Sequence, residues 1–267
     1  MTLTYELVDD IAFAAEQPLR VNLGSHLLNA GLELLGPMIE YAWLRRSLRL
    51  PSLVEALSTP LSERFHAFTA EPPAICNGSL NDGSPFDFAH LPTSEEGFTS
   101  HSWISFKSRM MFAAETHGFS RAQAAALAGA MGEMASNAFE HSQRPCTAIA
   151  AFNASPAVFE FVVADAGIGA AASLRACPEF GHIHDPGEAL VLCISEGISR
   201  HGHDAKRGLG FQVLFARLAD LNARVRLRSE NQVIDLRGDC LGPRWAIPAG
   251  RPPIQGMLIS AQCFPPT

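Results

Sequence analysis

The chain has 267 residues, 47% of them hydrophobic and 18% charged, which is enough to bury a core in one large domain or two modest ones. Its formal net charge of −7 argues against a nucleic-acid-binding protein, because such proteins usually carry a basic surface that displaces counterions. The six cysteines form no C-x-x-C pair and the first ten residues include acids, which indicates reduced thiols and a cytoplasmic protein.

The N-terminal region predicts alternating strand and helix. Residues 19–23 favour a short strand, and Ser25 is placed to cap a long helix that follows it. The most apolar window, residues 27–44, contains Glu33 and Glu40, so a membrane span would bury two carboxylates at a cost of several kcal/mol. We therefore predict a core helix without membrane contact, in a small N-terminal α/β domain that is regulatory or binds a partner.

A change in composition marks the predicted domain boundary. Residues 77–97 are rich in Gly, Ser, Asp, Asn and Pro, which favour turns and open chain. We predict an N-terminal domain of unknown type over residues 1–94 and a second domain over residues 95–267. The second domain begins with a helix over residues 102–117, which Gly118 ends.

The next predicted helix carries the most informative polar residues. Ser120 and Gln123 have the spacing of a capping box at a helix start. Glu133, Asn137 and His141 follow at intervals of four residues, so they share one face of the helix. Taken alone, this face is also typical of a solvated stripe opposite an apolar core stripe.

The remaining predicted elements are strands, two helices and a long loop. We predict a hairpin of residues 147–152 and 157–164. A lid follows over residues 170–206, with one helical stretch at 186–198 and few apolar anchors outside that stretch. The last predicted elements are a helix over 209–220, a second hairpin of residues 224–228 and 232–237, and a strand over 257–263.

Two glycine-rich stretches complete a set of three motifs. Asp165 ends an apolar strand-like run and is followed by Gly167 and Gly169, giving D-x-G-x-G. Gly208 and Gly210 form a G-x-G stretch that leads into a helix. In this order, with the helix that carries Glu133, the motifs resemble the N-box, G1 box and G2 box of the GHKL ATPase superfamily.

The resemblance covers about residues 98–263. The E-x-x-x-N-x-x-x-H form of the N-box is most similar to that of the anti-sigma-factor serine kinases. The resemblance implies an α+β protein with the Bergerat fold, a two-layer α/β sandwich whose mixed, mostly antiparallel sheet is covered on one face by helices. It also implies ATP and Mg²⁺ as cofactors.

The family resemblance assigns a role to each matching residue. Asp165 would accept a hydrogen bond from the adenine amino group, and Gly167 and Gly169 would let the backbone approach the base. Asn137 would bind Mg²⁺ through its amide oxygen, and Glu133 would be the general base. The other residues assigned to the nucleotide site are His141, Lys206, Arg207, Gly208, Leu209 and Gly210.

Phosphate contacts are the least defined part of this assignment. Gly208 and Gly210 would let backbone N–H groups at a helix N-terminus meet phosphate. Lys206 and Arg207 either reach the β- or γ-phosphate or form a solvated basic pair. Glu140 stands where many members of the family have lysine or arginine, which leaves open any phosphate contact from the N-box helix.

Two functions remain open from the sequence. One is a protein kinase that transfers the γ-phosphoryl group of ATP to a serine or threonine of a regulatory partner protein. The other is an ATPase or an ATP-gated interaction module without kinase activity. A sensor histidine kinase is disfavoured because neither His101 nor His117 is followed by an acid.

Two further questions stay open from the sequence. The oligomeric state is one of them, with a homodimer among the alternatives. The other is the role of two His-x-His pairs, which are either polar loop residues or zinc ligands. The pairs are His182 with His184 and His201 with His203.

Overall fold

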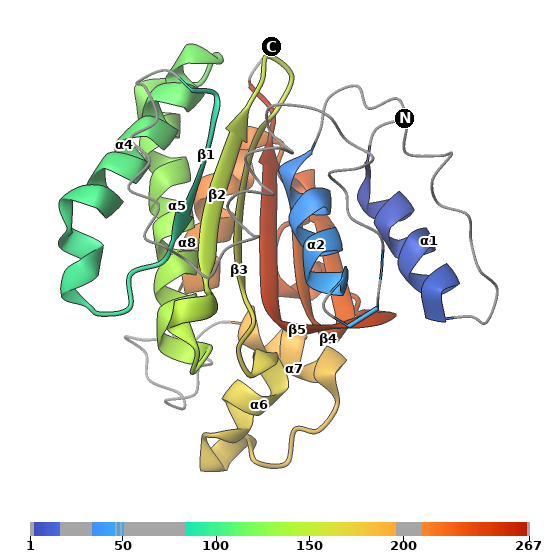
Figure 1. Ribbon diagram of the computed structural model, residues 1–267. Helices are drawn as coiled ribbons and strands as arrows, with labels where there is room; N and C mark the ends of the chain where they lie inside the picture. The colour runs from blue at the N-terminus through green and yellow to red at the C-terminus, as the bar shows by residue number, and fades with distance from the viewer. Residues whose placement is uncertain are drawn as a thin grey trace.

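The computed structural model describes residues 3–16, 34–45, 47, 48, 50, 84–195 and 210–265. In these residues the protein is α+β, with seven α-helices and a five-stranded sheet (Figure 1). The helices are α1 (Tyr5–Glu16), α2 (Leu35–Arg45), α4 (His101–Thr116), α5 (Arg121–His141), α6 (Gly169–Arg175), α7 (Pro186–Cys193) and α8 (Gly210–Leu218). The strands are β1 (Phe86–His90), β2 (Ile149–Ala154), β3 (Phe159–Asp165), β4 (Arg224–Arg237) and β5 (Ala249–Cys263).

The strands are arranged in the order β1-β2-β3-β5-β4. All four pairings are antiparallel, so the predicted mixed sheet is wrong for the described strands. β2 and β3 form the predicted hairpin, with Ala154 opposite Phe159 at its closed end. β3 lies at the centre of the sheet, and every one of its residues is buried.

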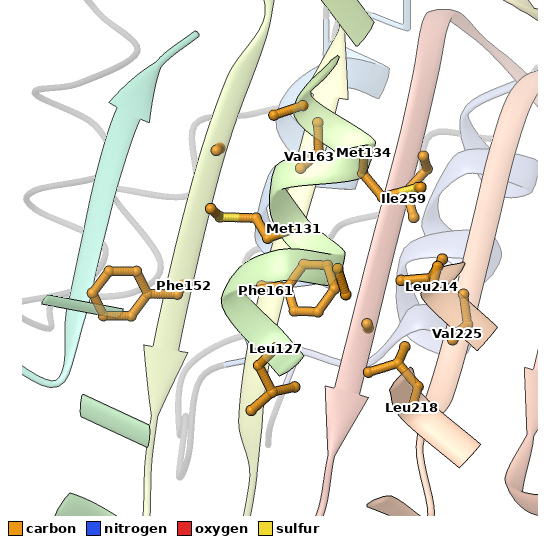
Figure 2. Packing of buried hydrophobic residues seen from close by; sticks show 14 of the residues in the cluster. Leu127, Met131, Met134, Phe152, Phe161, Val163, Leu214, Leu218, Val225 and Ile259 are labelled. Atoms are coloured by element: carbon orange, nitrogen blue, oxygen red, sulfur yellow. The ribbon is translucent and has the colours of Figure 1, made fainter. Parts of the chain in front are cut away.

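Helices α4, α5 and α8 form a layer on one face of the sheet (Figure 1). Their apolar side chains pack against alternate residues of the strands, because successive strand residues point to opposite faces. Figure 2 shows this core, which includes Leu127, Met131, Met134, Phe152, Phe161, Val163, Leu214, Leu218, Val225 and Ile259. The sheet and these three helices therefore form two layers, as predicted.

Helices α1 and α2 cover the opposite face of the sheet (Figure 1). The alternation along β3 separates the two cores: Phe161 and Val163 face α5, whereas Val162 and Ala164 pack with the N-terminal helices. The sequence did not predict helices on this second face. These helices and β1 precede the predicted domain boundary after residue 94. The two helices nevertheless pack on the sheet, and β1 is one of its strands.

The predicted hairpin of residues 224–228 and 232–237 is confirmed. It lies within β4, where Gly238 donates its N–H to the carbonyl oxygen of Ala223 at 2.9 Å and Arg226 pairs with Asp235 at 3.0 Å, so the two ends of the segment lie side by side. The chain reverses near Glu230, whose φ is +51°, and residues 224–229 pair with β5. The predicted last strand is the C-terminal part of the longer β5.

Two predictions from composition are wrong. Residues 77–97 were predicted as turns, but Phe86–His90 forms the edge strand β1. The segment after β3 was predicted to have few apolar anchors outside residues 186–198, but α6 and α7 enclose a small core of their own. That core contains Ala171, Leu174, Cys177, Phe180, Ile183 and Ala189. The predicted strand at 19–23 lies outside the described residues.

Among the described helices, none combines the length and apolarity needed to cross a membrane.

Candidate functional site

Helix α5 begins with the predicted capping box. The Ser120 side chain accepts the N–H of Gln123, and the Gln123 side chain accepts the N–H of Ser120 at 2.8 Å. The helix then runs without interruption to His141. Glu133, Asn137 and His141 are half-buried on one flank of it, so the structure keeps them on a common face.

Helix α8 packs on that same flank. A Cβ placed on Gly129 would lie 2.3 Å from Nη1 of Arg217, so the Arg217 guanidinium lies against the backbone of α5. Gly129 precedes Glu133 by four residues, and Asn137 follows by another four, so all three share one face. The face of α5 that carries Glu133 and Asn137 therefore also carries, at Gly129, the contact with α8.

The two helices run antiparallel. In Figure 2, Leu218 lies level with Leu127, and Leu214 lies further along α5 toward Met134. Seven helical residues separate Arg217 from Gly210, an advance of about 10.5 Å. The N-terminus of α8, where Gly210 stands, is therefore level with the turn of α5 that holds Asn137.

The D-x-G-x-G turn follows the central strand. Asp165 is the last residue of β3 and is 5% exposed. Its Oδ1 accepts the N–H of Gly167 at 2.8 Å. Burial raises the pKa of the Asp165 carboxyl to about 6, although hydrogen bonds from the backbone of Gly167 and Met257 act in the opposite direction. The carboxyl group is therefore mostly ionised at pH 7 and remains an acceptor.

The turn contacts the C-terminal end of α5. Ile168 donates its N–H to the carbonyl oxygen of Ser142 at 3.0 Å. A Cβ on Gly167 would lie 2.2 Å from the same oxygen. The glycine is therefore required for the close approach of the turn to α5. This contact brings the carboxylate of Asp165 to the end of the helix that carries Glu133 and Asn137.

The second glycine of the turn has a different role. Gly169 has φ +77°, a conformation that glycine adopts without steric cost. It leads directly into α6, whose first N–H groups are capped from β4: Ser229 Oγ accepts from Ala170 at 2.9 Å, and Glu230 Oε1 accepts from Ala171 at 3.3 Å. The turn is thus attached to both α5 and β4.

Sequence reasoning missed the residues that hold this turn. Thr147 accepts the N–H of Ala166 through Oγ1 at 3.0 Å, and Ser142 and Ser229 make the contacts given above. Each is a short polar residue far from the turn in sequence, so no local spacing marks it. For Thr147, the only sequence signal is its place at the start of a predicted strand.

Only part of the G2 box is described. Gly210 begins α8, whereas Lys206, Arg207, Gly208 and Leu209 lie outside the described residues. His201 and His203 lie outside them too. The side chains of His182 and His184 are exposed. Within the part of the chain that the structure describes, no three His, Cys, Asp or Glu side chains form a group that could hold a metal ion.

An open hollow of about 610 Å³ lies elsewhere on the surface, and none of the predicted site residues lines it. Two of its charged side chains are engaged within the protein: Arg251 pairs with Asp9 at 2.7 Å, and Glu230 caps α6. We therefore assign no ligand to it. Its lining is Glu16, Pro186, Glu230, Asn231, Arg251, Pro253 and Ile254.

No protein-family model, curated protein or solved structure matches the chain.

The residues at the junction of α5, α8 and the turn fit an adenine nucleotide and Mg²⁺. One oxygen of Asp165 already accepts an N–H, and a carboxylate has further lone pairs for another donor. Asn137 supplies a half-buried amide oxygen, a ligand type that suits a hard cation. Glu133 lies on the same flank, one helical turn away.

Proposed function

We propose that this chain is an ATP-binding regulatory protein of the histidine-kinase-like (GHKL) type, which transfers the γ-phosphoryl group of ATP to a serine or threonine of a partner protein. The observation that carries the proposal is the contact of Gly167 and Ile168 with the carbonyl oxygen of Ser142. It joins two of the three motifs, although Ser142 and Ile168 are separated in sequence by a complete β-hairpin.

The architecture supports the Bergerat fold. The antiparallel sheet carries α5 and α8 on one face, and the proposed adenine-binding carboxylate ends the central strand. The third motif leads into α8, whose N-terminus is level with Asn137 along α5. A helix N-terminus presents free N–H groups and a favourable dipole to an anion. The position of α8 thus suits phosphate binding beside the proposed metal ligand.

Each residue would perform a separate step. The ionised Asp165 would accept the adenine amino group, which guanine lacks at that position. Asn137 would hold the cation through its amide oxygen, and Glu133 would accept the proton of the attacking hydroxyl. When bound, Mg·ATP would supply the phosphoryl group and the positive charge that stabilises its transfer.

Two experiments test the proposal. Calorimetric titration should give binding of Mg·ATP and much weaker binding of Mg·GTP; equal affinities would contradict the role of Asp165. Incubation with γ-labelled ATP and co-purifying proteins should then label a partner serine or threonine. Release of free phosphate alone would indicate an ATPase. Binding without either product would indicate an ATP-gated interaction module.

A further inference from the structure

Helix α2 is attached to the back of the proposed nucleotide site. It lies on the sheet face opposite α5 (Figure 1) and packs against β3 and β5. Buried polar contacts anchor it to the sheet near its N-terminus, at its middle and near its C-terminus. The last of these contacts is made directly to Asp165.

The first anchor is the carboxylate of Glu160 in β3. It accepts the N–H groups of Leu35 and Gly36, the latter at 3.0 Å, and the side-chain amide of Gln262 at 3.1 Å. Negative charge at a helix N-terminus is favourable because the helix dipole is positive there. A Cβ on Gly36 would lie 2.9 Å from Oε1 of Glu160, so the helix start is held closely against the strand.

The second anchor is an ion-pair cluster at the middle of α2. Glu40 pairs with Arg226 at 2.8 Å and also with Arg228. Asp9 of α1 pairs with Arg226 at 2.9 Å. Less than a tenth of each side chain is exposed. Removing one member of such a buried group leaves an uncompensated charge, so the cluster fixes α1 and α2 relative to β4.

The third anchor is the indole of Trp43. Its Nε1 donates to the backbone carbonyl oxygen of Asp165 at 2.9 Å, and Trp43 is 2% exposed. The carbonyl is also confined by Gly256, where a Cβ would lie 2.1 Å from the same oxygen. The backbone of Asp165 is therefore held from the back of the sheet, while Gly167 holds its carboxylate from the front.

We infer that Trp43 is a positioning residue for adenine recognition: by holding the carbonyl of Asp165, it sets the direction of the Asp165 carboxylate and couples the docking of α2 to nucleotide affinity. This inference rests on the proposed function. Without the indole N–H, the buried carbonyl of Asp165 loses a hydrogen bond, which is unfavourable. The end of β3 then rearranges, and the carboxylate is no longer aligned with the adenine amino group.

The test is a double-mutant cycle on ATP binding. Trp43→Phe removes the N–H and keeps most of the apolar volume, and we expect Mg·ATP affinity to fall roughly tenfold. Because the effect acts through Asp165, Trp43→Phe should weaken binding no further in an Asp165→Asn background. Trp103→Phe is the matched control. It shortens a buried tryptophan of α4 that is 3% exposed and stacked on Phe106, and it should leave ATP affinity unchanged.

A second measurement uses the wild-type protein. Opening of the hydrogen bond between Trp43 and Asp165 would lower ATP affinity by some factor. By thermodynamic reciprocity, bound ATP must then make that opening less favourable by the same factor. Exchange of the Trp43 indole proton, assigned by its loss in Trp43→Phe, should therefore slow when Mg·ATP is added. If wild type binds ATP but the Trp43→Phe variant binds it equally well, or if exchange is unchanged at saturating ATP, Trp43 has no positioning role. If wild type does not bind ATP, the proposed function itself fails.

Discussion

The N–H of Ile168 lies 3.0 Å from the carbonyl oxygen of Ser142, so the turn after the central strand is bonded to the residue that follows α5. The helix end and the turn thereby form one structural unit. A displacement of either would separate the carboxylate of Asp165 from the polar flank of α5.

Gly167→Ala should impair both folding stability and nucleotide binding. The new Cβ would lie 2.2 Å from a backbone oxygen and 2.8 Å from Oδ1 of Asp165, so the turn must move away from α5. We expect a loss of about 1–3 kcal/mol in the free energy of unfolding. Gly132→Ala is the matched control, since nothing lies within 4 Å of its Cβ. It should stabilise α5 by about 0.5–1 kcal/mol. Urea denaturation of the two variants measures both values.

Asp165→Asn should change how stability depends on pH. The folded pKa, about 6, is raised above the ordinary value of 3.8, so the native state binds more protons than the unfolded state between these values. Stability of wild type therefore falls as pH rises through this window, and the contribution amounts to roughly 3 kcal/mol. The variant lacks this contribution. Its stability relative to wild type should rise between about pH 4 and pH 6 and stay constant above pH 7.

The same substitution should weaken ATP binding by roughly 1–3 kcal/mol, because an amide donor would face the adenine amino group. Denaturation curves at several pH values and calorimetry at pH 7.5 measure the two effects. A parallel pH dependence in variant and wild type would mean that Asp165 ionises without cost in the folded protein.

Local features of this fold could be predicted from the sequence, and long-range ones could not. The capping box depends on two residues three positions apart, and the D-x-G-x-G turn follows an unbroken apolar run, so both follow from short-range rules. The hairpin that reverses near Glu230 follows from local turn propensity in the same way. Its pairing with β5 does not, because that is a tertiary contact.

The residues of the candidate site likewise fall into those that local sequence could identify and those that it could not. Glu133, Asn137 and Asp165 could be named from motif spacing. Ser142, Ser229 and Trp43 could not, because their contacts join residues distant in sequence; Trp43 and Asp165 are 122 positions apart. Nothing in the composition of α2 distinguishes an indole that packs in a core from one that also holds a strand end.

Glu40→Ala should strongly destabilise the protein. Glu40 and Arg228 are fully buried and Arg226 is 4% exposed, so the variant leaves two buried guanidinium groups without their shared carboxylate. The expected loss is about 3–5 kcal/mol. Glu6→Ala is the control: its partner Arg237 is 4.0 Å away and both side chains are largely exposed. The control should lose less than about 1 kcal/mol, measured in the same denaturation series. Similar small losses in both would mean that solvent screens the Glu40 cluster.

Asn137→Ala should produce a defect that depends on magnesium. The amide oxygen of Asn137 is the proposed metal ligand, so its removal should weaken binding of Mg·ATP more than binding of ATP measured with a chelator. Calorimetric titration of wild type and variant under both conditions gives the comparison. An equal loss with and without magnesium would assign Asn137 to the nucleotide rather than to the cation.

Glu133→Ala should separate catalysis from binding. Glu133 lies on the flank of α5 that also carries Asn137, and a positioned general base contributes about 10²–10⁴-fold in rate. Turnover should fall by that factor, while ATP affinity stays near that of wild type.

Glu140→Ala is the matched control, because this carboxylate of the same helix is exposed and hydrogen-bonded to Ser136 at 3.3 Å. The control should keep full turnover. Phosphate-release or phosphotransfer assays beside calorimetry measure both properties. Full turnover in Glu133→Ala would overturn the general-base assignment, and an inactive wild type with every partner tested would favour the ATP-gated interaction module.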